Sequence, residues 1–274
     1  MKVHISVDME GISGVVKGNQ VMPGEEEYEK SQELMVGDAN AAIEGALEAG
    51  AEEIIVNDSH DGMTNLDINK LNPEAHLISG YVKPLVMMEG VEGADASMFI
   101  GYHAKIGTKK GVLSHSFFGV NVNRMIMNGT EVGEPEINAA VAGHFGVPVV
   151  FLSGGERVCD LVKSSIGEWV KAVAVKEDLG RAAAKCLHPE KSHKLIKEGV
   201  KEALANLSEA RTVEPNLPVT FEIEFFTGQM ADQAETCPFA ERVDSRRIKT
   251  TGETVLEGFQ KLLVLAKLGQ ADLF

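Results

Sequence analysis

The sequence predicts an α/β fold: a mostly parallel sheet covered by helices, followed by a second, smaller α+β domain. Short continuous apolar runs alternate with helical patterns through the first half of the chain, for example at residues 53–58 and 147–153. Continuous apolar strands are buried on both faces, as in a parallel sheet between two layers of helices. In the second half, residues 218–225 alternate strictly between apolar and polar side chains, which is typical of a sheet with one face in water.

The first half supplies its strands and helices in turn. Apolar and polar residues alternate over positions 3–7 and predict a first strand with one apolar face. Residues 27–49 carry apolar side chains at helical spacing, and Gly50 is suited to end that helix. Another helix is expected to begin at Glu134, because the proline that follows is tolerated in a first helical turn. Further strands are expected at residues 53–58, 75–79, 97–101 and 147–153.

The second half has a different pattern. Amphipathic helices are predicted at residues 191–206 and 253–268, on either side of the alternating strand. We therefore expect two domains, an α/β domain at residues 1–155 and a smaller α+β domain at residues 156–274.

Composition argues against several classes of protein. The formal net charge of −15 at pH 7 disfavours a nucleic-acid or anionic-membrane partner, since both need clustered lysine and arginine. The cysteines Cys159, Cys186 and Cys237 form no CxxC pair, so we expect them to be reduced and mostly buried, as in the cytoplasm. The chain enters a strand at its N-terminus rather than a signal peptide, and its apolar runs are too short to span a bilayer.

Acidic and histidine side chains collect where the predicted elements begin or end. Asp8 and Glu10 follow the first strand, and because they are two residues apart their carboxylates point the same way. His60 and His103 follow later strands, and Glu134 opens a helix, whose N-terminus favours an ionised carboxylate. The carboxyl ends of parallel strands lie at one edge of a sheet, so we expect these residues to meet there. Adjacent carboxylates repel unless a proton or a cation lies between them, and the pattern therefore predicts a site for two metals.

Each residue also has an ordinary structural explanation when it is taken singly. Asp8 and Glu10 could cap a loop or a helix, and His60 could be a turn residue, because Asn-Asp-Ser sequences favour turns. His103 could be a core histidine with a satisfied hydrogen bond, and Glu134 could be only a helix-terminal acid. Five ligand-type residues at the same edge of one sheet favour the metal site over these separate explanations.

The residue types narrow the choice of metal. Imidazole together with carboxylate suits zinc, and also manganese, iron or cobalt, whereas an all-oxygen set would have suited magnesium or calcium. Asp8 is the candidate for a carboxylate that bridges two cations through its two oxygens. His115, which stands between two serines, is left over as an imidazole that could move protons or stabilise an oxyanion, or that merely decorates a loop.

Five short motifs that contain all these residues occur in order along the first half of the chain. They are Ser6-Val7-Asp8-Met9-Glu10-Gly11-Ile12-Ser13-Gly14, Val56-Asn57-Asp58-Ser59-His60, Gly101-Tyr102-His103-Ala104, Ser114-His115-Ser116 and Val132-Gly133-Glu134. In order and spacing they resemble the D-aminopeptidase DppA family, the zinc peptidases grouped as M55. The resemblance covers roughly the first 150 residues, and weaker similarity continues to the C-terminus.

The resemblance implies a specific activity and a specific site. Asp8, Glu10, His60, His103 and Glu134 would be the ligands of two zinc ions, with Asp8 bridging them, and His115 would be the additional catalytic residue. The substrates would be short peptides with an N-terminal D-residue, such as D-Ala-D-Ala. The protein would be a homo-oligomer, a ring-shaped decamer that encloses a channel, and residues 156–274 would contribute to the substrate pocket and the oligomer contacts.

Two other functions remain open from the residues alone. One is a two-metal hydrolase of another class, such as a phosphoesterase, which needs cationic side chains near the metals; Lys105 and Lys109 are available for this. The other is a non-catalytic, metal-dependent peptide-binding protein. That protein would need no spare proton-transfer group, so His115 argues mildly against it.

Overall fold

The computed structural model describes residues 1–270 of the chain. Its larger sheet has the strand order β3-β2-β1-β4-β7-β8-β9, and every neighbouring pair is parallel except β8 and β9. The predicted α/β class with a mostly parallel sheet is thus confirmed. The strands are β1 (Lys2–Val7), β2 (Glu53–Asp58), β3 (Ala75–Ile78), β4 (Ala96–Tyr102), β7 (Val149–Gly155), β8 (Lys171–Gly180) and β9 (Ala183–Cys186).

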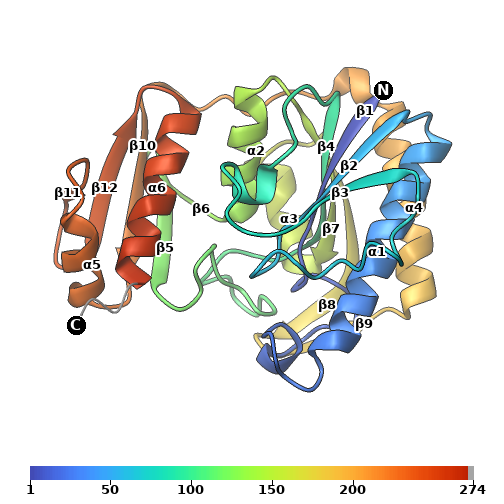
Figure 1. Cartoon of the computed structure of the whole chain (residues 1–274), viewed down its shortest axis with the longest axis horizontal. Helices are drawn as coiled ribbons and strands as arrows, with labels where there is room; N and C mark the ends of the chain where they lie inside the picture. Colours follow the sequence, from blue (N-terminus) through green and yellow to red (C-terminus); the bar gives the residue numbers. More distant parts are fainter. Residues whose placement is uncertain (271–274) are drawn as a thin grey trace.

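Helices cover both faces of this sheet. α1 (Tyr28–Glu48) and α4 (Pro189–Ala205) lie side by side on one face, whereas α2 (Glu134–His144) and α3 (Glu156–Ser165) lie on the other (Figure 1). The apolar side of α1 packs with β1 and β2 in one continuous hydrophobic core. Gly50 ends α1 as predicted, with a φ of 88° that glycine adopts without strain.

The smaller sheet is antiparallel, with the strand order β11-β12-β10-β5-β6. Its strands are β5 (Val122–Met127), β6 (Thr130–Val132), β10 (Val219–Phe225), β11 (Glu241–Arg242) and β12 (Arg247–Gly252). α5 (Gly228–Glu235) and α6 (Val255–Gln270) pack against β10 and β12, and α6 also contacts α2. Buried and partly exposed residues alternate along β10, which confirms the predicted pattern of one wet face. Short 3-10 helices lie at η1 (Gly18–Gln20), η2 (Val86–Met88) and η3 (Leu207–Glu209).

The polar face of the first strand is buried together with its apolar face. His4 and Ser6, the polar residues of the alternation, are fully buried. Both find partners inside the protein: His4 Nδ1 lies 2.9 Å from Ser97 Oγ, and the Ser6 hydroxyl lies 2.7 Å from Tyr102 Oη. A central strand of a sheet that helices cover on both sides buries all its side chains, and polar ones are tolerated when they are hydrogen-bonded.

Both sheets take strands from before and after residue 155. The larger sheet takes β8 and β9 from beyond that point, and the smaller sheet takes β5 and β6 from before it. One hydrophobic core also runs from α2 and α3 through α6 to the smaller sheet. The smaller sheet is therefore assembled from an excursion of the chain after β4 and from the C-terminal segment. The division into a domain at 1–155 and a domain at 156–274 stays a prediction.

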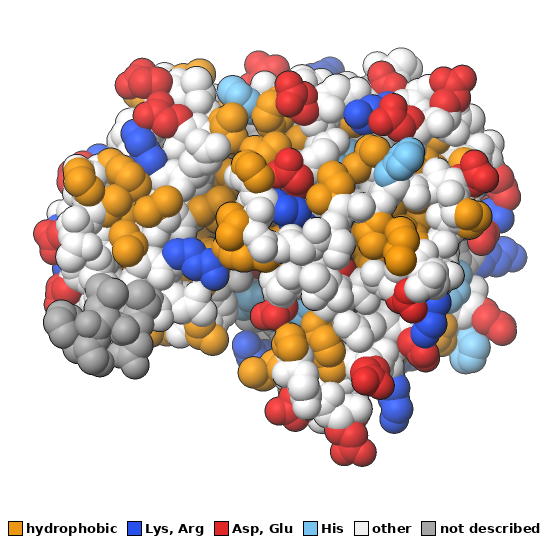
Figure 2. All heavy atoms as spheres, in the orientation of Figure 1, with side chains coloured by type: hydrophobic (Ala, Val, Ile, Leu, Met, Phe, Trp, Pro, Cys, Tyr) orange, Lys and Arg blue, Asp and Glu red, His pale blue; other side chains and the backbone are white. Residues whose placement is uncertain are grey.

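The surface in Figure 2 carries lysine and arginine side chains scattered among aspartate and glutamate rather than gathered into one basic area. Within residues 1–270, no helix is long and apolar enough to cross a membrane. All three cysteines are free, as predicted. Cys159 is buried and Cys237 is partly buried, but Cys186 is exposed because it ends the edge strand β9.

Candidate metal centre

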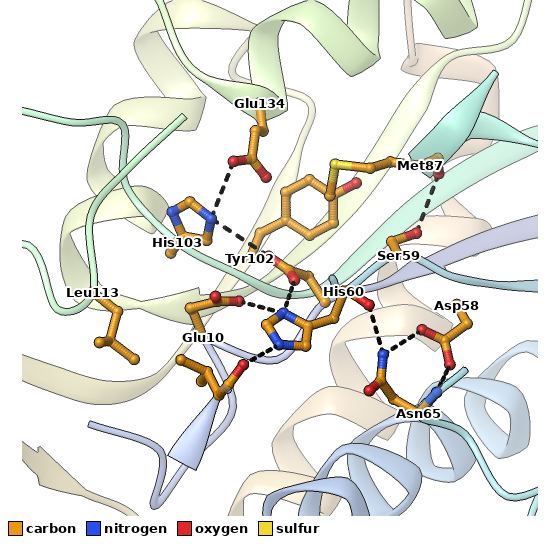
Figure 3. A network of polar contacts seen from close by, with 12 residues as sticks. Glu10, Asp58, Ser59, His60, Asn65, Met87, Tyr102, His103, Leu113 and Glu134 are labelled. Carbon is orange, nitrogen blue, oxygen red and sulfur yellow. Dashed lines mark hydrogen bonds and ion pairs between the residues drawn. The ribbon is translucent and has the colours of Figure 1, made fainter. Parts of the chain in front are cut away.

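The structure brings the five predicted ligands together at the carboxyl edge of the larger sheet. Asp8 and Glu10 follow β1, His60 follows β2, His103 follows β4, and Glu134 is the first residue of α2. Figure 3 shows the imidazoles of His60 and His103 between the carboxylates that point toward them. All five residues are at most 5% exposed, so none of these ionisable groups is solvated by bulk water.

Asp8 lies between the two imidazoles. Its Oδ1 is 3.3 Å from His60 Nδ1, and its Oδ2 is 3.5 Å from His103 Nε2. Each imidazole has a second carboxylate: His60 Nδ1 is 3.0 Å from Glu10 Oε2, and His103 Nε2 is 3.3 Å from Glu134 Oε1. The site thus consists of two halves that share one aspartate.

The outer nitrogen of each imidazole is held by the backbone. His60 Nε2 donates to the carbonyl oxygen of Val21 at 2.8 Å, and His103 Nδ1 donates to that of Ala104 at 3.0 Å. A carbonyl oxygen only accepts hydrogen bonds, so these contacts place the N–H on the outer nitrogen and leave the inner nitrogen as a ligand atom. Metal-binding histidines in proteins are oriented in the same way.

Charge is unbalanced in this pocket without a cation. Burial, followed by repulsion from Glu10, raises the pKa of Asp8 to about 7. Burial alone would lower the pKa of His103, but the nearby carboxylates of Glu134, Asp8 and Glu10 together outweigh burial and raise it to about 10. Without a metal ion, Asp8 and His103 therefore hold protons more tightly than usual, because the buried carboxylates lack a compensating positive charge. This is the behaviour expected of a cation site.

The donor set fits a pair of divalent cations. Asp8 Oδ2, Glu10 Oε2 and His103 Nε2 are buried without a hydrogen-bond partner within residues 1–270. Such atoms are costly to bury unless something binds them. Three carboxylates and two imidazoles supply mixed oxygen and nitrogen ligands, which suit zinc, manganese, iron or cobalt rather than calcium.

His115 lies beside this set and closes it toward solvent. Its ring stacks on that of His103, with centroids 4.0 Å apart, and its Nε2 is 3.8 Å from Glu134 Oε1. Nδ1 donates to the carbonyl oxygen of Leu113 at 2.9 Å, so Nε2 carries the lone pair. Burial and the charge of His103 lower the pKa of His115, which keeps it neutral near pH 7. His103, His115 and Glu134 are close enough to share one cation, so the geometry admits either a ligand or a proton-transfer role.

Two glycines allow the ligand loops to approach each other. Gly11 N donates to the carbonyl oxygen of Gly101 at 2.7 Å, which ties the loop after β1 to the end of β4. A Cβ atom on Gly11 would lie 2.0 Å from the carbonyl oxygen of Tyr102, and one on Gly101 would lie 2.2 Å from that of Asp8. Gly101 also has a φ of 70°, which L-residues rarely adopt. The glycines thus fix the distance between Asp8 and His103.

Lys176 supports the same loop from the far end of the chain and was not predicted from the sequence. It lies on β8 and is 2% exposed. Its ammonium group donates to the carbonyl oxygens of Glu10, Ile12 and Val15, at 2.5, 3.0 and 2.6 Å. The only signal in the sequence is a lysine at the end of a short run of alanine and valine, which does not say what the lysine contacts.

Asp58, the acidic residue nearest to His60 in the sequence, is not part of the metal-ligand set. Its carboxylate accepts hydrogen bonds from the backbone N–H of Asn65 and Leu66 and from the side chain of Asn65. Asn65 in turn donates to the carbonyl oxygen of His60 at 2.7 Å (Figure 3). Asp58 therefore shapes the loop that presents His60.

Comparisons with known proteins agree with this geometry. The sequence profile of the D-aminopeptidase family, M55, matches residues 1–264. The D-aminopeptidase of Bacillus subtilis (strain 168) is 38% identical over 277 residues, and the match covers 100% of both chains. A solved structure, the Zn-dependent D-aminopeptidase DppA from Bacillus subtilis, a self-compartmentalizing protease, superimposes with a TM-score of 0.96 at 37% identity, again over 100% of both chains. The chain belongs to the D-aminopeptidase family, M55.

Proposed function

We propose that this protein is a binuclear zinc-dependent aminopeptidase that hydrolyses short peptides with an N-terminal D-residue, such as D-Ala-D-Ala. The observation that carries the proposal is the pair of imidazole–carboxylate halves that share Asp8. Membership of the D-aminopeptidase family and the likeness to a relative described as Zn-dependent support the metal and the reaction.

The ligands we propose divide between two zinc ions. Asp8 would serve both ions, because each of its oxygens faces a different imidazole. His60 and Glu10 complete one set, and His103 and Glu134 complete the other. The three carboxylates give the site a formal charge of −3, which two divalent cations more than neutralise.

Bound zinc polarises a carbonyl oxygen and lowers the pKa of water toward about 7, which supplies a nucleophile at neutral pH. His115 acts as the proton-transfer group: its neutral Nε2 accepts a proton from the attacking water and delivers it to the leaving amine. The second zinc ion or a nearby carboxylate would hold the substrate's free amine. Burial of the ligands excludes bulk water from the reacting atoms.

The assembly and the compartment are also proposals. We propose a homo-oligomer of ten subunits; the relative described as self-compartmentalizing supports an oligomeric assembly. Light scattering on the purified protein gives the subunit count, and a monomer mass at micromolar concentration contradicts the assembly. The free cysteines support the cytoplasm as the compartment, because paired cysteines are typical of oxidising ones.

The test is a substrate panel on the zinc-reconstituted protein. We expect turnover of D-Ala-D-Ala with little action on L-Ala-L-Ala and none on p-nitrophenyl phosphate. Faster turnover of the L,L-dipeptide would overturn the specificity. Hydrolysis of the phosphate ester would favour the phosphoesterase, although Lys105 already pairs with Glu131. Zinc binding without any turnover would favour the non-catalytic peptide-binding protein.

A further inference from the structure

A cavity of about 310 Å³ opens next to His115. It lies between the loop of residues 106–119 and the turn that joins β8 to β9, and we call it the basic cavity. Its wall includes Lys110, Ser114, His115 and Arg181. His115 thus faces the basic cavity on one side and Glu134 of the candidate metal centre on the other.

The two cations of the basic cavity have no ionic partner within the described part of the chain. Lys110 and Arg181 are both exposed and make no ion pair with any carboxylate of residues 1–270. The protein has a net charge of −15, and most of its other lysine and arginine side chains form ion pairs with carboxylates. Two unpaired cations that line one cavity therefore offer a place for an anionic group.

The walls of the basic cavity are joined to each other by hydrogen bonds. Asp178 on β8 accepts from the backbone N–H of Val112 at 2.8 Å, and the carbonyl oxygen of Arg181 accepts from Leu113 N at 2.8 Å. Lys110 has a φ of 66°, so the loop holds a lysine in a backbone conformation that L-residues rarely adopt. Both cations are thus attached to backbone whose position is fixed relative to His115.

The candidate metal centre and the basic cavity lie on opposite sides of His115. The carboxylates of Asp8, Glu10 and Glu134 lie at one end, His115 lies in the middle, and Lys110 and Arg181 lie at the other end. A short peptide carries an amine at one end, which a metal ion of the candidate metal centre or a nearby carboxylate would hold, and a carboxylate at the other end, which suits the two cations of the basic cavity. The volume of the cavity is at the small end of ligand sites, which suits one or two amino-acid residues.

We propose that Lys110 and Arg181 bind the free C-terminal carboxylate of the substrate and so restrict the enzyme to very short peptides. This inference rests on the proposed aminopeptidase function. Arg181 offers a planar fork of N–H donors that matches both carboxylate oxygens, and Lys110 adds a second positive charge. A longer peptide would have to place an uncharged amide against these cations, at a cost in binding.

The experiment compares D-Ala-D-Ala with D-Ala-D-Ala-amide on the zinc-loaded enzyme and its variants. We expect the wild type to prefer the free acid in kcat/KM by at least about tenfold, the size of one charge-assisted contact. Arg181→Gln and Lys110→Gln raise KM for the acid and leave the amide within about twofold of wild type. Lys109→Gln is the matched control, because Lys109 is an exposed cation on the same loop that does not line the cavity; it leaves both substrates unchanged.

A second readout does not depend on turnover. Isothermal titration measures binding of a D-Ala-D-Ala analogue with a reduced peptide bond, as the acid and as the amide, to the same zinc-loaded proteins. If wild type binds the acid more tightly than the amide and Arg181→Gln does not, the subsite is supported. If no peptide is hydrolysed at the same time, the proposed function is contradicted but the subsite is not. Equal binding and equal turnover of acid and amide by wild type overturn the subsite and leave the proposed function standing. Equal losses on both substrates in Arg181→Gln also overturn it, because they indicate a structural role.

Discussion

The imidazole rings of His103 and His115 are stacked with their planes 12° apart, so one histidine covers the other. Their surroundings differ in a way that separates their roles. His103 is held between Asp8 and Glu134, whereas the nearest carboxylate oxygen to His115 is 3.8 Å away and its side chain is 20% exposed. The buried partner has the contacts of a ligand, and the outer one has those of a group that meets substrate.

The first prediction separates ligand from proton-transfer group. Asp8→Asn keeps the size of the side chain but removes the charge that bridges two cations, so zinc content and turnover should fall together. His115→Ala should retain zinc and lose turnover by roughly 10²–10⁴-fold, the range for a proton-transfer group or an oxyanion donor. Elemental analysis and D-Ala-D-Ala hydrolysis are measured on both variants. Loss of zinc from His115→Ala would make His115 a ligand; normal turnover would make it a loop residue.

The second prediction concerns the close approach at Gly101. Alanine there would place Cβ against the carbonyl oxygen of Asp8 and would also adopt a φ of 70°. We expect Gly101→Ala to lower the free energy of unfolding by about 2–5 kcal/mol, the sum of a left-handed conformation and a core overlap. Zinc affinity should fall as well, because Asp8 is displaced.

Gly50→Ala is the matched control for Gly101→Ala. Gly50 has a φ of 88° but nothing lies within 4 Å of its Cβ position. This variant should lose only about 1–2 kcal/mol, for the backbone conformation alone, and should bind zinc normally. Urea denaturation gives both free energies. Equal losses in the two variants would show that the contact with Asp8 contributes nothing.

The third prediction tests how Lys176 holds the loop of Glu10. Lys176→Met keeps much of the volume but leaves three backbone carbonyl oxygens without their donor. Each unsatisfied buried acceptor costs about 1–3 kcal/mol, so the variant should be strongly destabilised and should bind zinc more weakly. Lys171→Met is the control on the same strand, since its surface ion pair with Glu202 contributes about 0–1 kcal/mol. Unchanged zinc affinity in Lys176→Met would contradict a positioning role for Lys176.

The fourth prediction concerns Asp38, a buried acid on α1 that is remote in sequence from the metal ligands. Burial raises its pKa from 3.8 to about 7. Its Oδ1 lies 3.4 Å from His193 Nε2, and its Oδ2 is buried with no hydrogen-bond partner in residues 1–270. The folded state binds the proton more tightly than the unfolded state, so stability from this group is full below pH 4 and is lost as the pH rises to about 7.

Asp38→Asn removes that pH dependence. At pH 8 we expect it to be more stable than wild type by on the order of 2–4 kcal/mol, at 1.36 kcal/mol per pKa unit. Near pH 4 the difference should nearly vanish, because the wild-type acid is then protonated. Urea denaturation at several pH values measures the effect. A variant that is less stable than wild type at pH 8 would show that the carboxylate ion is paired in the folded state.

The parallel sheet and the meeting of the five candidate ligands at one edge of it could be predicted, because both leave local signals. Each ligand stands directly after an apolar strand or at a helix start, and the topology of parallel strands brings such positions to one edge. The smaller sheet was predicted only in part. β10 has a regular alternation, but β6 has only three residues, and β5 pairs with β10, which lies far along the chain. No local pattern states which distant strand an edge will pair with.

The supports of the site could not be predicted for a related reason. Lys176 and Arg181 lie in β8 and in the turn after it, a segment for which no strand was predicted from the sequence, and their roles arise from contacts with residues 10–15 and 106–119. Asp58 looks like a ligand in the sequence, but its oxygens are taken by backbone N–H groups seven and eight residues later. A sequence motif shows which side chains could bind a metal, but it does not show which of them already accept hydrogen bonds from the protein.

The bond between Lys176 and the carbonyl oxygen of Glu10 joins residues 166 positions apart. The ribosome synthesises the chain from the N-terminus, so Glu10 emerges long before β8 has been made. Until then the loop that carries Glu10 lacks the ammonium group that orders three of its carbonyls. The loop that carries Glu10 therefore gains the ammonium group that orders it only after most of the chain has been synthesised.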